Sequence, residues 1–213
     1  MPAYTVQAEV VDISTDTPKA ADAFWVDTNV WYWMSYTRAS HRRADRQPKH
    51  YQKKLYPAYL KKAMSVRSKF FWHGLGLSEL ARQIEDGERE IAESLGHVPV
   101  GISAKDFRHG HPALRAQVVK EVRSCCDVIK YVAKPLRPAF KANCASLKTA
   151  MSDMGTCALD AYDLFALQSL REARITHVLT DDGDFCTVSG ITLFTANRGV
   201  IEAARAQGKL KIR

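Results

Sequence analysis

Two short apolar runs in this sequence each end directly in aspartate. Residues 24–26 lead into Asp27, and residues 178–180 lead into Asp181 and Asp182. Apolar runs of this length, bounded by polar turns, are typical of buried strands in a parallel sheet. Ligands of open parallel sheets bind at the carboxyl ends of the strands. The sequence therefore predicts an α/β fold with acidic side chains gathered at one edge of its sheet.

Strand and helix patterns alternate in the parts of the chain that flank these runs. We expect further strands at residues 4–13, 69–72 and 191–195, and helices at 57–68, 77–84, 159–174 and after Asn197. Alternation of this kind favours a mostly parallel sheet with helices on both faces. We predict a three-layer α/β/α sandwich with a short sheet.

The middle of the chain has a different pattern. Val118, Val122, Cys125, Ile129 and Val132 recur at intervals of three and four residues, which indicates an amphipathic helix. A further helix is expected over residues 139–151. We predict one domain of 213 residues, in which 1–20 form an N-terminal extension and about 87–155 form a helical insertion.

Charge and cysteine usage narrow the classes of partner. The net charge of +8 attracts polyanions. Because no apolar run is long enough to cross a bilayer, we expect nucleic acid rather than a membrane. The five cysteines form no C-x-x-C pair, which argues against a zinc knuckle or a disulfide framework. With no secretion signal recognisable at the N-terminus, we expect reduced thiols and a cytoplasmic location.

Four acids are candidates for a common site. Glu79 follows the strand at residues 69–72, and Asp163 lies on the helix that precedes the strand ending at Asp182. Two bare charges about 4 Å apart repel each other by roughly 4 kcal/mol at an effective dielectric constant near 20. Mg²⁺ or Mn²⁺, which prefer oxygen ligands, would remove that repulsion. Taken singly, Asp27 could instead cap a helix and Asp182 could form a turn.

The order of these motifs resembles that of PIN-domain ribonucleases, a family that includes toxins of toxin–antitoxin pairs. The resemblance covers residues 24–84 and 157–204. It is carried by the segments Phe24-Trp25-Val26-Asp27-Thr28-Asn29-Val30, Leu77-Ser78-Glu79-Leu80, Asp163, Thr180-Asp181-Asp182-Gly183-Asp184-Phe185 and Ile191-Thr192-Leu193-Phe194-Thr195-Ala196-Asn197.

This resemblance implies a metal-dependent endoribonuclease. The catalytic and metal-binding acids would be Asp27, Glu79, Asp163 and Asp182. Asp184 would be a further metal ligand, and the supporting residues would be Thr28, Asn29, Asp160 and Thr180. Asp160 competes with Asp163 for the third acidic position. The implied cofactor is Mg²⁺ or Mn²⁺, and the implied partners are RNA, a cognate antitoxin protein and a second copy of the chain.

A basic run follows the first of these motifs. Cations bind phosphates and aromatic faces stack on unpaired bases, so a basic run with interleaved tyrosines suits single-stranded RNA. The alternative is a solvated helix face. The candidate RNA-binding residues are Arg38, Arg42, Arg43, Arg46, Lys49, Lys53, Lys54, Lys61 and Lys62.

Two other functions remain open at this stage. A phosphatase of the haloacid-dehalogenase kind also has aspartate after its first strand, but it requires a second aspartate where this chain has Asn29. The other possibility is a catalytically idle RNA-binding or scaffold protein on the same fold. Carboxylate-dependent affinity for Mn²⁺ would distinguish the nuclease from such a binder.

Overall fold

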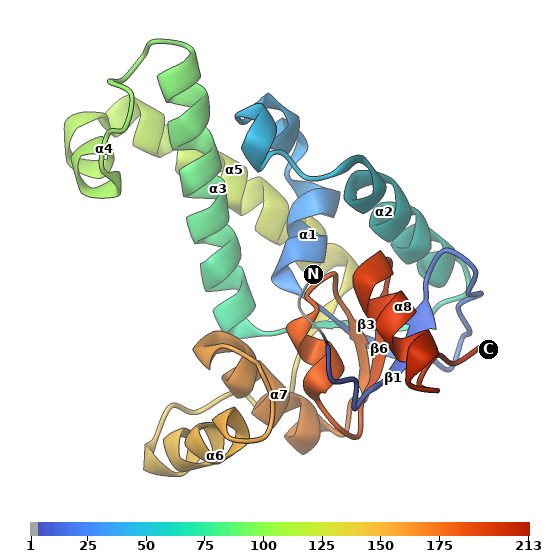
Figure 1. Ribbon diagram of the computed structural model, residues 1–213. Coiled ribbons are helices and arrows are strands. Elements are labelled where there is room, and N and C mark those ends of the chain that lie inside the picture. The colour runs from blue at the N-terminus through green and yellow to red at the C-terminus, as the bar shows by residue number, and fades with distance from the viewer. Residues whose placement is uncertain (1–3) are drawn as a thin grey trace.

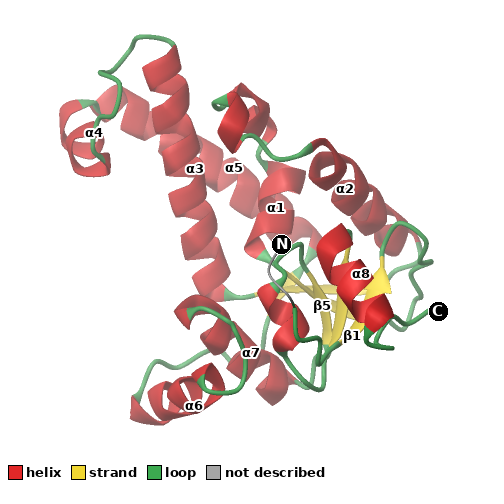
Figure 2. Cartoon of the chain, viewed as in Figure 1, coloured by secondary structure: helices red, strands yellow, loops and turns green. Residues whose placement is uncertain are grey.

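The computed structural model describes residues 4–213, and it contains a six-stranded parallel sheet (Figures 1 and 2). The strand order is β1-β6-β5-β2-β3-β4, and each neighbouring pair is parallel. The strands are β1 (Glu9–Asp12), β2 (Ala23–Val26), β3 (Lys69–Trp72), β4 (Lys134–Pro135), β5 (His177–Leu179) and β6 (Thr192–Thr195).

Eight α-helices and three short 3₁₀ segments connect the strands in the described part of the chain. The helices are α1 (Thr28–Ser35), α2 (His50–Ser65), α3 (Gly74–Ser94), α4 (Ala104–Gly110), α5 (Pro112–Val132), α6 (Cys144–Met154), α7 (Ala161–Ala173) and α8 (Arg198–Ala206). The 3₁₀ segments are η1 (Thr37–His41), η2 (Ala44–Arg46) and η3 (Asp184–Thr187). None of the helices in residues 4–213 is long and apolar enough to span a bilayer.

The strands have hydrophobic cores on both faces, because successive side chains of a strand point to opposite sides. Phe24 and Val26 of β2 pack in a core with residues of α1, α2, α3 and α5. Trp25 packs in a second core with residues of α7 and α8. The predicted three-layer α/β/α sandwich is therefore confirmed.

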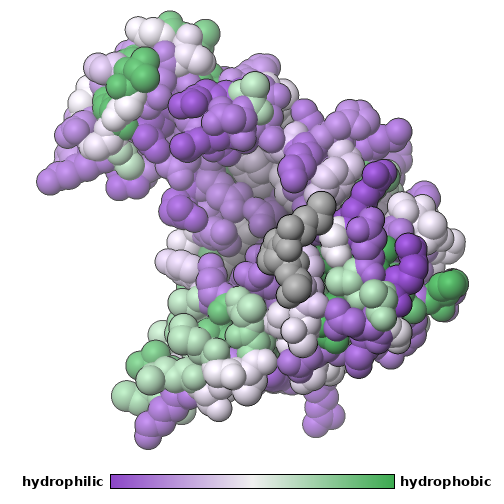
Figure 3. All heavy atoms as spheres, viewed as in Figure 1, coloured by the Kyte–Doolittle hydropathy of each residue, from purple (hydrophilic) through white to green (hydrophobic). Residues whose placement is uncertain are grey.

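Helices α3, α4 and α5 form an arm that projects beyond the sheet layers (Figure 1). Phe107 and Val118 form a small core of their own with Ala92 and Val98. This core holds α4 against the outer ends of α3 and α5, so the arm has its own hydrophobic support. Its surface in Figure 3 is mostly hydrophilic, except near the tip.

Several expected boundaries were wrong. Helix α2 begins at His50, and Pro57 lies inside it rather than in its first turn. The first strand is only Glu9–Asp12 rather than residues 4–13, and it belongs to the sheet through its pairing with β6. Helix α3 continues to Ser94, which is well past the predicted end at residue 84. Because Ala92 is buried in a cluster with Phe107 of α4 and Val118 of α5, tertiary packing extends the helix.

The middle of the chain also differs in detail from the expectation. The second helix predicted there, at residues 139–151, is α6, which starts at Cys144 because the Asn143 side chain caps it. Between α5 and α6, Lys134–Pro135 pairs with β3 as an edge strand. Proline is tolerated at an edge because no neighbouring strand requires its missing N–H. This segment therefore adds a strand to the sheet as well as helices.

Candidate active site

The carboxyl ends of β2 and β5 lie side by side at one edge of the sheet. The two strands pair in parallel, with Val26 opposite Leu179. The Asp27 backbone N–H extends this ladder and donates to the Leu179 carbonyl at 3.1 Å. The residues that follow both strands, Asp27 and Thr180-Asp181-Asp182, are therefore neighbours despite their distance in sequence.

Asp27 is the most buried acid at this edge, with an exposed fraction of 4%. It is the N-cap of α1, and its Oδ1 accepts a 2.6 Å hydrogen bond from the Thr28 amide. Its Oδ2 accepts one of 2.6 Å from the Thr180 hydroxyl. The Asp27 pKa is raised to about 7, first by burial and then by the charges of Glu79 and Asp182, against the opposing effect of these hydrogen bonds. Asp27 therefore both caps α1 and belongs to the acidic cluster.

Asp160 and Asp163 have different roles at the start of α7. Asp160 is exposed and caps the helix, accepting from the amides of Tyr162 at 2.9 Å and Asp163 at 3.1 Å. Asp163 is half-buried, and its pKa is raised to about 9, first by burial and then by the charges of Asp27 and Asp160. Asp163 is therefore the better candidate for the third acidic position.

Asp182 joins the cluster from the β5 side. Its backbone N–H donates to the Thr180 hydroxyl at 2.9 Å, and its Oδ1 accepts from the Asp184 amide at 2.9 Å. Burial is the largest cause of its raised pKa, and the charge of Asp184 contributes. Asp184 itself is exposed at the start of η3, so it lies further out than Asp182.

Glu79 approaches the cluster from α3. The Gln83 amide group donates to Glu79 Oε1 at 3.2 Å and to Asn29 Oδ1 at 3.2 Å. The Thr28 hydroxyl donates to the Gly76 carbonyl at 3.4 Å, and a Cβ at Gly76 would lie only 3.0 Å from that hydroxyl. Glycine at position 76 thus allows α3 to approach α1 closely. Gln83 was missed by the sequence reasoning, although its position one helical turn after Glu79 is a usable signal.

The donor chemistry of the cluster fits a hard divalent cation. All four acids offer carboxylate oxygens, and the charges of Glu79 and Asp182 both raise the pKa of Asp27 and of Asp163. Among residues 4–213, no group of three or more His, Cys, Asp or Glu side chains already converges tightly enough to hold an ion. The fit therefore lies in the chemistry of the donors, and coordination would need side-chain rotations.

Comparison with protein-family models, curated proteins and solved structures gave no significant match. The resemblance to PIN-domain nucleases therefore depends on the motifs of this chain alone.

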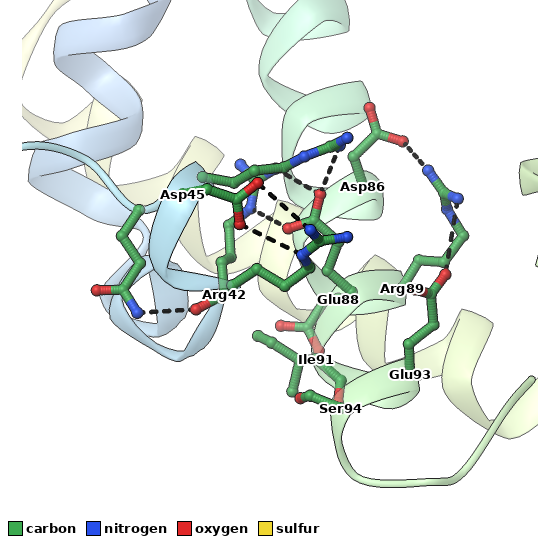
Figure 4. A network of polar contacts seen from close by, with 12 residues as sticks. Arg42, Asp45, Asp86, Glu88, Arg89, Ile91, Glu93 and Ser94 are labelled. Carbon is green, nitrogen blue, oxygen red and sulfur yellow. Dashed lines mark hydrogen bonds and ion pairs between the residues drawn. The ribbon is translucent and has the colours of Figure 1, made fainter. Parts of the chain in front are cut away.

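The basic run divides into paired and unpaired cations. Arg38 forms an ion pair with Glu88 at 2.8 Å, and Arg42 and Arg46 each form one with Glu90 at 2.9 Å. Both glutamates are about 5% exposed and belong to α3, and Arg42 points toward this helix (Figure 4). These three arginines therefore neutralise buried acids and help to attach the η1–η2 segment to α3.

The lysines of the run are free to meet a ligand. Within the described residues, the following make no ion pair and are exposed: Lys49, Lys53, Lys54, Lys61 and Lys62. Among residues 4–213, Arg43 pairs with Asp45 alone, and both are largely exposed. The lysines, most of them on α2, are the stronger candidates for contacts with phosphates.

Asp181 attaches α2 to this edge of the sheet. It accepts hydrogen bonds from the Tyr51 hydroxyl at 2.8 Å, the Gln52 amide at 2.7 Å and the Tyr56 hydroxyl at 2.7 Å. The sequence reasoning gave Asp181 no role, because three adjacent acidic or turn residues do not show which of them points inward. Through Asp181, the N-terminal half of α2 lies next to Asp182.

Proposed function

We propose that this chain is a divalent-metal-dependent endoribonuclease. The observation that carries the proposal is the gathering of Asp27, Asp163 and Asp182 at one sheet edge, where burial raises the pKa of each and the charge of Asp182 also raises the pKa of Asp27 and of Asp163. Strongly perturbed carboxylates gathered at such an edge are a recognised sign of a functional site. Their repulsion favours a bound cation over the metal-free state.

Asp27, Glu79, Asp163 and Asp182 would hold Mg²⁺ or Mn²⁺. When bound, the ion would supply a more acidic water and would neutralise charge on the oxygens of a phosphodiester. Thr180 keeps Asp27 Oδ2 in position through its 2.6 Å hydrogen bond. Gln83 holds Glu79 against α1. These hydrogen bonds limit the rotations that are open to Asp27 and Glu79 when an ion binds.

RNA is the substrate class that best suits the surroundings of the site. An acidic centre repels a polyanion, so the substrate needs cations close by. Lys49 and Lys53 are exposed on or beside α2, whose Tyr51 and Gln52 contact Asp181 next to the cluster. The five cysteines are free thiols, which suits activity in the reducing cytoplasm.

The test is cleavage of single-stranded and structured RNAs by the wild type and by Asp27→Asn, with Mn²⁺, Mg²⁺ or EDTA. We expect metal-dependent cutting that falls by at least about 100-fold in Asp27→Asn, since an acid of the metal site is lost. Asp12→Asn is the matched control, because Asp12 also ends a strand but lies on β1, separated from β2 by β6 and β5. RNA binding without cutting, unchanged by EDTA, would instead identify an idle binder.

A further inference from the structure

An arginine-lined cavity of about 610 Å³ lies between α3, α4 and α5. Its lining includes Arg82 and Glu85 of α3, Arg108 of α4, and Arg115 and Arg123 of α5. Val118, Val119 and Val122 add an apolar wall. The cavity belongs to the projecting arm and is separate from the carboxylate cluster.

The charges of this cavity are unbalanced. Glu85 is 4% exposed and forms ion pairs with both Arg108 and Arg115. Arg82 and Arg123 are exposed, and neither forms an ion pair within the described residues. Four guanidinium groups thus meet one carboxylate. Because buried acids normally need only one partner, the excess of positive charge is available to an anion from outside.

Arg82 connects the cavity to the candidate active site. It lies three residues after Glu79 on α3, and side chains three residues apart on a helix are neighbours, with Cβ atoms about 5–6 Å apart. An anionic chain that leaves the carboxylate cluster along α3 therefore meets Arg82 first. Beyond Arg82 the cavity offers the other arginines together with an apolar valine wall.

We propose that this cavity binds the RNA substrate at a phosphate adjacent to the one that is cut, with the attached nucleoside against the valines. The inference rests on the proposed function and gives the α3–α5 arm a role in substrate binding. Guanidinium groups form bidentate hydrogen bonds with phosphate oxygens, and their planar faces also stack on bases. An acidic polypeptide would bind to the same arginines, but its binding would not depend on the position of Arg82 next to Glu79.

The binding test uses Arg82→Gln/Arg123→Gln, because these arginines have no ion-pair partner within residues 4–213 whose loss would disturb folding. The matched control is Lys130→Gln/Arg205→Gln, which removes two exposed positive charges on α5 and α8. Both pairs are placed in an Asp27→Asn chain so that the probe is not cut. Fluorescence anisotropy with a labelled single-stranded octaribonucleotide gives the affinity over a series of salt concentrations.

We expect the Arg82/Arg123 pair to weaken binding on the order of tenfold at low salt, and the salt slope to fall by about 1.4, which corresponds to two lost contacts with a single strand. The control pair should keep the slope of its parent. Equal affinities and slopes in the two double variants would overturn the inference. Weaker binding of poly-glutamate by Arg82→Gln/Arg123→Gln, with unchanged binding of RNA, would overturn it as well.

Failure of the proposed function has a different signature. Hydrolysis of bis(p-nitrophenyl) phosphate by wild type with Mn²⁺ reports on the carboxylate cluster, since this ester is too small to extend from Glu79 into the cavity. No metal-dependent hydrolysis of either this ester or RNA would reject the nuclease itself. Metal-dependent hydrolysis, together with unchanged RNA binding in Arg82→Gln/Arg123→Gln, would reject only the role of the cavity.

Discussion

Thr180 and Asp27 are 153 residues apart in sequence, yet the Thr180 hydroxyl donates a 2.6 Å hydrogen bond to Asp27 Oδ2. The same hydroxyl accepts a 2.9 Å hydrogen bond from the Asp182 backbone N–H. Thr180 is fully buried, so no water replaces these contacts at its position. One hydroxyl therefore fixes two acids of the cluster relative to each other.

Replacing Thr180 by valine should lower the affinity for Mn²⁺ by roughly 10- to 100-fold, the usual cost of losing a group that orients a ligand. The valine keeps the shape of the side chain but leaves the Asp27 carboxylate and the Asp182 amide without their shared partner. Thr180→Ser retains the hydroxyl and should recover most of the affinity. Isothermal titration of both variants provides the measurement. Equal affinities for valine and serine would contradict a positioning role.

The metal-free protein should lose stability as pH rises. The pKa values of Asp27 and Asp163 are raised in the folded chain to about 7 and about 9, above their unfolded values near 4. The folded state therefore holds protons that the unfolded state has released, and stability falls from about pH 4 up to these folded pKa values. Melting temperatures in EDTA between pH 5 and pH 9 should show this fall, and Mn²⁺ should reverse it.

Asp163→Asn should remove much of that pH dependence. An amide stays neutral without taking up a proton, so we expect the metal-free variant to gain about 1–3 kcal/mol at pH 8 while losing metal-dependent activity. Asp153→Asn, which loses an ion pair with Arg171 away from the cluster, is the control and should not gain stability. A variant that melts with the pH profile of the wild type would show that Asp163 is not under electrostatic strain.

Arg213 should be important for stability although it lies far from the cluster. Its guanidinium group is 8% exposed, bonds to Asp16 and Asp22, and lies 4.6 Å from the centre of the Phe194 ring. Arg213→Ala would leave two buried carboxylates without a cation, at a cost of about 3–5 kcal/mol. Lys211→Ala breaks only the exposed pair with Glu9 and should cost less than about 1 kcal/mol. Urea unfolding distinguishes the two outcomes.

Substituting the paired arginines and substituting the free lysines should have different effects on stability and on RNA binding. Arg42→Ala leaves Glu90 and the Tyr32 hydroxyl without a donor they now share, so we expect a stability loss of about 2–4 kcal/mol. Lys53→Gln/Lys54→Gln should leave stability within about 0.5 kcal/mol but weaken RNA binding several-fold. Unfolding curves and anisotropy on the same proteins test both halves. Weaker RNA binding at unchanged stability in Arg42→Ala would assign that arginine to the substrate instead.

Local sequence pattern was sufficient for the α/β class and for the strand ends that carry Asp27 and Asp182. Buried strands need continuous apolar residues, and the polar residues that follow them mark the edge of the sheet. The same reasoning did not show where α3 ends, because the last turns of α3 are stabilised by packing of Ala92 with Phe107 and Val118. It also missed the edge strand Lys134–Pro135, since two residues carry no periodicity.

The sequence by itself determined which residues bring charge and oxygen ligands to the edge of the sheet. Only the tertiary structure decided how those charges are used. Asp160 is occupied in capping α7, Asp181 in holding α2, and Arg42 in neutralising Glu90, although each looked equally available along the chain. The physical reason is that a charge acts through its distance to partners and to water. Those distances are set by segments far apart in the chain and become definite only when the chain packs.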